Sequence, residues 1–204
     1  MKTDIKIQFT LIHRILHWIM ALAMPVLFLT GFLRMNWMNK KHIIGIIESK
    51  TDLLAKEQSM EIAKSILEPM WQWHEVFAHI MIFSFLARII YMLAKGIRFP
   101  NPFQRNQPLK ERLQGFTYVY FYLFVFISAV TGICIRQGFF PQWKENIEAV
   151  HKWSVYWFPI FILLHFVGIV IAELSSKKRS HLKNDWWGLK KNFDIDKPKY
   201  FTII

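Results

Sequence analysis

The chain has almost no cysteine and no extended hydrophilic region. Cys134 is the single cysteine among 204 residues, so the sequence contains no disulfide framework. No Cys-x-x-Cys-His sequence is present either, which excludes covalent attachment of a c-type haem. Four long apolar runs leave little room for a separate soluble domain.

Those apolar runs place the chain among membrane proteins. Hydrophobic residues make up 53% of the sequence and aromatic residues 17%, which favours this class. The runs cover residues 15–33, 76–94, 116–135 and 153–173, and each is near the roughly 20 residues that cross a bilayer core. We predict an all-α integral membrane four-helix bundle, a single membrane domain over residues 1–204. Its spans lie at about 15–34, 74–94, 116–136 and 151–174. The first run is too long for the apolar region of a signal peptide, so we expect it to stay as the first span.

The formal net charge of +12 is unevenly distributed along the chain. Residues 95–112 carry five Lys/Arg against one acid, a net of +4, and residues 175–204 carry eight against three, a net of +5. The connection 35–72 is neutral, with five of each sign, and 137–150 has a net of −1. By the positive-inside rule, both termini are cytoplasmic and 175–204 is a basic cytoplasmic tail, with Trp186 and Trp187 at the inner interface. The basicity therefore indicates membrane topology and not a nucleic-acid partner.

The first outer connection, 35–72, is predicted to contain a short helix. Apolar residues recur at near-helical spacing between residues 51 and 68, and Pro69 provides a stop signal. This helix is expected on the outer membrane surface, where it either covers a site or simply packs on the bundle.

Histidines within the apolar runs are the candidate functional residues. His151 and His165 are fourteen residues apart, so on one continuous helix they share a face, about 21 Å apart along the axis. With alternating helix directions, His74 and His151 form an outer pair, and His17 and His165 form an inner pair. One pair in each leaflet is the arrangement that bis-histidine ligation of two haems requires.

Other interpretations of these histidines are weaker. A single intramembrane histidine is often a structural hydrogen-bonding residue, but two depth-matched pairs are less easily explained in that way. A divalent-metal transporter usually recruits carboxylates or thiolates, and the runs offer only Glu75 and Glu173, both near their ends. His42 and His181 are interpreted as solvated loop residues. His79 lies about 140° round the helix from His74 and cannot easily serve the same site. His13 shares a face with His17, and its role stays open.

Several of these features resemble one family. They are the His17–Trp18 pair, the arginine Arg88 fourteen residues after His74, and the H-x13-H spacing of the last span. Over about residues 8–175 the chain resembles the bacterial cytochrome b561 and nickel-hydrogenase b-type cytochrome superfamily. The resemblance implies two b haems with His17, His74, His151 and His165 as axial ligands to iron, and Arg14 and Arg88 as candidates for the haem propionates. It also implies that the LTGF and VTGI sequences supply small residues near the porphyrins. His13, His79 and the long first outer connection depart from the family pattern.

The function implied is di-haem electron transfer across the bacterial inner membrane, in exchange with the quinone pool. The favoured form is a free-standing cytochrome b561-like oxidoreductase that accepts electrons from a small outer donor. The alternative is a haem-bearing membrane anchor of a hydrogenase or formate-dehydrogenase-like complex. A haem-free transporter or scaffold ranks third.

Overall fold

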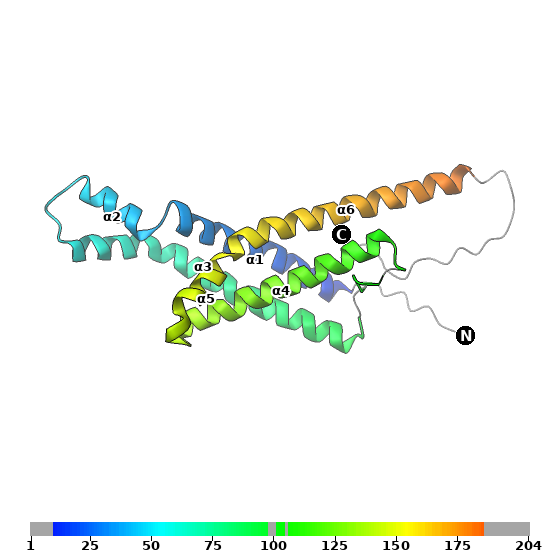
Figure 1. Cartoon of the computed structure of the whole chain (residues 1–204), viewed down its shortest axis with the longest axis horizontal. Coiled ribbons are helices and arrows are strands. Elements are labelled where there is room, and N and C mark those ends of the chain that lie inside the picture. The colour runs from blue at the N-terminus through cyan, green and yellow to red at the C-terminus, as the bar shows by residue number, and fades with distance from the viewer. Residues whose placement is uncertain (1–9, 98–100, 105, 186–204) are drawn as a thin grey trace. The chain divides into compact units, whose positions relative to one another are not determined.

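The computed structural model describes residues 10–97, 101–104 and 106–185, and these residues form helices joined by turns, without a strand (Figure 1). Along the chain the helices are α1 (Leu11–Asn36), α2 (Lys40–Glu48), α3 (Lys56–Ala94), α4 (Leu109–Gln137), the 3₁₀ turn η1 (Pro141–Trp143), α5 (Lys144–Lys152) and α6 (Ser154–Asp185). The predicted all-α class is therefore confirmed. Trp186, Trp187 and most of the predicted basic tail lie outside the described residues.

Within the described residues, four segments are long and apolar enough to cross a membrane: Leu11–Asn36, Lys56–Ala94, Leu109–Gln137 and Pro141–Leu174. Their outward-facing side chains are large and apolar; Leu22, Phe83 and Leu163, for example, are 66%, 68% and 65% exposed. Contiguous apolar surface of this extent is unfavourable in water and is satisfied by lipid. The chain is a multi-pass membrane protein.

The helix that contains the second span, α3, begins earlier in the chain than predicted. α3 runs without interruption through Pro69, so the predicted stop at this residue is wrong. A proline inside a helix costs about 3 kcal/mol. Packing of the segment before it, where Ala63 and Leu67 are 0% and 1% exposed, offsets this cost. The segment predicted as a separate short helix is helical from Lys56, but as the start of α3. An additional short helix, α2, begins where the Asn39 side chain accepts a hydrogen bond from the His42 backbone, and it packs against α3.

The last predicted span is not one continuous helix. α5 ends at Lys152 and α6 begins at Ser154, with Trp153 in the turn between them. His151 therefore belongs to α5 and His165 to α6, and the expectation of one continuous helix is wrong. His42 and His181 were expected in loops, but they lie in α2 and α6.

The chain divides into two compact units. The larger unit comprises Phe9–Lys95 and Ser128–Phe158, and the smaller comprises Gly96–Ile127 and the chain from Pro159. In the larger unit, α1 and α3 pack antiparallel along their length (Figure 1). Thr10 at the start of α1 bonds to the Tyr91 hydroxyl near the end of α3, while Thr30 near the end of α1 bonds to His74. This pairing fixes which residues of the two helices lie at the same depth.

Candidate functional site

The larger unit brings His74 of α3 and His151 of α5 together. The centres of the two imidazole rings are 6.4 Å apart, and the ring planes are inclined at 76°. His74 is placed by the α1–α3 pair, and His151 by α5, which follows the short turn after α4. Both rings are partly shielded from solvent.

The hydrogen bonds of Thr30 fix the tautomer of His74. The Thr30 hydroxyl lies 2.8 Å from the Val26 carbonyl oxygen and 3.0 Å from that of Leu27, and its single hydrogen is directed at these acceptors. The same oxygen lies 2.8 Å from Nδ1 of His74. With its own hydrogen engaged, the hydroxyl oxygen accepts a hydrogen bond from Nδ1–H. Nε2 of neutral His74 therefore carries the free lone pair.

His151 has the same tautomer for a similar reason. Its Nδ1 lies 3.1 Å from the carbonyl oxygen of Ser128, which can only accept a hydrogen bond. The Thr131 hydroxyl lies 3.0 Å from the same nitrogen. Nδ1 therefore carries the hydrogen, and Nε2 again has the free lone pair. Among the residues that the structure describes, neither Nε2 makes a hydrogen bond.

Two matching Thr-Gly sequences support the two histidines. Thr30 and Thr131 supply the hydroxyls, and Gly132 lets His151 approach α4 closely. A Cβ added to Gly132 would lie 3.2 Å from Cε1 of His151, closer than side chains normally pack. Sequence reasoning noted the small residues of both motifs but missed the role of their hydroxyls. The repetition of Thr-Gly near the ends of two spans was the available signal.

An ion pair lies beside this pair of histidines. Nη2 of Arg136, in the last turn of α4, lies 2.8 Å from Oε1 of Glu75, the residue after His74. Both side chains are partly exposed, so the pair adds at most about 1 kcal/mol to stability. It does fix the end of α4 against α3. Neither residue was expected at the site.

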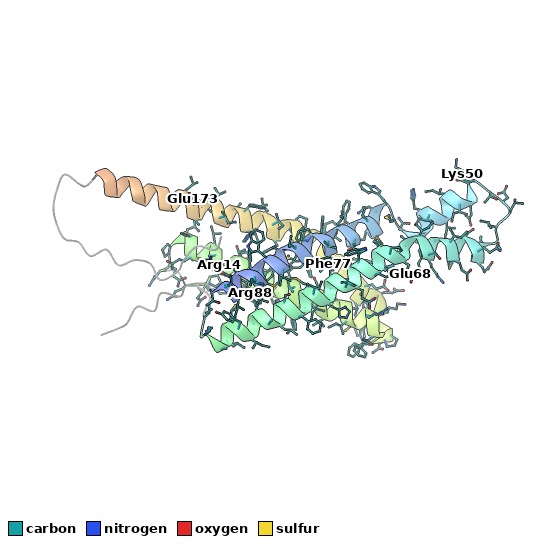
Figure 2. All side chains as sticks on the ribbon, turned by 180° about the vertical axis from the view of Figure 1, so that it is seen from behind. Arg14, Lys50, Glu68, Phe77, Arg88 and Glu173 are labelled. Atoms are coloured by element: carbon teal, nitrogen blue, oxygen red, sulfur yellow. The ribbon has the colours of Figure 1, made fainter. Side chains whose placement is uncertain are left out.

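The opposite end of the α1–α3 pair holds another cluster of polar residues. Arg88 is 4% exposed, and its Nε is buried without a hydrogen-bond partner among the described residues. His13 is also 4% exposed, lies against the Tyr91 ring and is close enough to Arg88 for their charges to interact. Figure 2 shows Arg14 and Arg88 on adjacent stretches of α1 and α3, and Arg14 is exposed there.

The predicted inner pair is divided between the units. His17 is half-buried in α1 of the larger unit, against the edge of Trp18. His165 is half-buried in α6 of the smaller unit, where its ring is nearly parallel to that of Phe161 at 5.7 Å. Their pairing stays a prediction. His79 is exposed, with Nδ1 2.7 Å from the Glu75 carbonyl oxygen, and does not face His74.

The family model for prokaryotic cytochrome b561 matches residues 8–183. This chain belongs to that family. No curated protein and no solved structure matches it. Membership makes the chain a membrane electron-transfer protein with b-type haem.

The His74–His151 pair of this cytochrome fits a haem. In the described residues, no group of three or more His, Cys, Asp or Glu side chains could hold a bare metal ion. A porphyrin supplies four nitrogens itself, so two histidines complete the coordination. The two ring centres are 6.4 Å apart, and with each Nδ1 engaged the Nε2 of each ring is the atom that could bind iron.

Replacing Thr30 or Thr131 by valine should weaken haem retention by the cytochrome. Each valine keeps the shape of threonine but removes the hydroxyl that fixes a histidine ring, and such supporting contacts are worth about 10–100-fold in metal affinity. We expect Thr30→Val to have the larger effect, because His151 keeps the Ser128 carbonyl as a second acceptor. Haem remaining per chain after dilution into detergent measures this. Thr117→Val, whose hydroxyl bonds to Leu113, is the matched control. If all three variants retain haem equally, the hydroxyls of Thr30 and Thr131 do not support haem binding.

Proposed function

We propose that this cytochrome carries two b haems and exchanges electrons with the membrane quinone pool. The observation that supports this most directly is the His74–His151 pair, with its 6.4 Å ring separation and both Nδ1 atoms engaged. Two neutral imidazoles with free Nε2 atoms, held by surrounding hydroxyls and carbonyls, are suited to axial ligation.

We assign the second haem to His17 and His165, as the sequence spacing predicts. Burial of Arg88 supports a haem carboxylate near this end of α1 and α3, because a charged guanidinium inside a membrane span requires an anionic partner. Its buried Nε without a hydrogen-bond partner is suited to a propionate. Arg14, exposed in the first turns of α1, is assigned to the same role at the membrane surface.

The protein's part in electron transfer is ligation, burial and local charge. Bound haem b supplies reversible one-electron chemistry, and the surrounding residues set its potential. Positive side chains near the haem carboxylates would favour the reduced state. We further propose a bacterial inner-membrane location with both termini cytoplasmic, from the alternation of basic and neutral connections.

The cytochrome expressed alone should contain two haems per chain. Acid-acetone should extract them completely, because no Cys-x-x-Cys-His sequence is present to attach them covalently. A pyridine haemochrome assay gives the number, and reduction of the purified protein by a soluble quinol analogue tests the quinone exchange. One haem or none per chain would contradict the di-haem proposal.

The same preparation distinguishes the two forms of the function. A free-standing oxidoreductase should be stable and fully loaded without other subunits. If the chain accumulates haem only when a dehydrogenase or hydrogenase subunit is co-expressed, the cytochrome is a membrane anchor of such a complex.

A further inference from the structure

Arg34, in the last turn of α1, has a polar atom without a partner. Its Nη1 is shielded from solvent and makes no hydrogen bond to any residue that the structure describes. The contact recorded for this side chain is with Trp71 of α3, where the guanidinium carbon lies 5.4 Å from the centre of the indole ring. Such a cation–π contact holds the guanidinium against the ring but leaves its N–H groups free to bind an acceptor.

The position of Arg34 relates it to the His74–His151 pair. Thr30, which fixes His74, lies four residues before Arg34 and therefore on the same side of α1. Trp71 lies three residues before His74, one turn away on α3, and its ring meets the His74 ring edge-on at 5.7 Å. Arg34 and Trp71 thus form the next layer of the α1–α3 pair beyond His74, toward the end of α1.

In the described part of the chain, no carboxylate forms an ion pair with Arg34. Glu75, beside His74, is paired with Arg136 at 2.8 Å. Glu68, one turn before Trp71, accepts a hydrogen bond from Gln72 at 3.5 Å. The carbonyl groups at the end of α1 favour a positive charge nearby, but that general attraction does not supply Nη1 with an acceptor.

We propose that Arg34, held on Trp71, binds a propionate carboxylate of the haem whose axial ligands are His74 and His151. This inference rests on the haem assigned to that pair under the proposed function. A haem has two carboxylates at one edge, and a planar guanidinium binds a carboxylate through two parallel hydrogen bonds. A lipid phosphate has similar anion chemistry, and the experiment below distinguishes the two sources.

Loss of the Arg34 charge should lower the midpoint potential of one of the two haems. Ferric haem carries one more positive charge than ferrous haem, so a nearby cation favours the ferrous state. In Arg34→Gln we expect the ferrous-to-ferric equilibrium of that haem to fall roughly tenfold, which is about 59 mV for a one-electron couple. Arg34→Lys keeps the charge but loses the paired hydrogen bonds, so its shift should be smaller. This variant also keeps the test usable if Arg34→Gln folds poorly.

Spectroscopic redox titration in lipid-depleted detergent measures both potentials. Lys41→Gln removes a positive charge from an exposed position in α2, where solvent screens it, and should leave both unchanged. Unchanged potentials in Arg34→Gln would overturn the proposal. If that variant instead loses co-purified phospholipid while its potentials are unchanged, the ligand is a lipid phosphate. Wild-type protein with no haem at His74 and His151 would contradict the proposed function itself, and the haem count in the same samples separates these outcomes.

Discussion

Replacement of His74 or His151 by alanine is expected to remove the same haem and to halve the haem content of the cytochrome. The rings lie 6.4 Å apart and each is fixed through Nδ1, and the proposed function assigns both imidazoles to one iron. A double variant should therefore lose no more haem than either single variant. Pyridine haemochrome content and the reduced-minus-oxidised difference spectrum measure both results.

His79→Ala is the matched control for this experiment. This histidine lies five residues after His74 on the same helix, but it is exposed and its Nδ1 is close to the Glu75 carbonyl oxygen. It should retain both haems. If the His74 and His151 variants lose different haems, so that the double variant contains none, the two histidines are not ligands of one iron.

Alanine in place of His17 should remove the other haem, whereas alanine in place of His13 should leave both haems bound. The reason lies in how deeply each residue is buried. His13 is 4% exposed and faces α3, where it contacts Tyr91 and interacts with Arg88. His17, one turn further along α1, is half-buried and keeps more of its ring accessible to a cofactor.

The same spectra test this assignment. His165→Ala should reproduce the His17→Ala spectrum, with the haem of His74 and His151 intact. His13→Ala is expected to keep both haems and to change only the potential of the inner one, because His13 lies close to Arg88. If His17→Ala keeps both haems and His13→Ala loses one, the haem ligand on α1 is His13 and not His17.

Local features of the chain were sufficient to predict part of this architecture. The number of spans follows from the length of the apolar runs, because crossing a bilayer depends on about 20 consecutive residues and not on distant ones. Helix direction likewise predicted that His74 and His151 lie at one depth, and the structure brings their rings together. Pro69 and Trp153 show where this reasoning failed: one was expected to end a helix that continues, and the other interrupts a helix expected to be continuous. Both outcomes depend on packing with other segments.

The sequence by itself determined the membrane class, the family and the histidines that can reach a common depth, since these follow from composition, spacing and helix direction. Only the tertiary structure decided which imidazole nitrogen is free. The Nδ1 of His74 is engaged by a hydroxyl 44 residues away, and that of His151 by one 20 residues away. Spacing along one helix cannot reveal such contacts, because they depend on which side chains of separate helices meet after packing. The Nη1 of Arg34, which has no hydrogen-bond partner among the described residues, is likewise a property of packing.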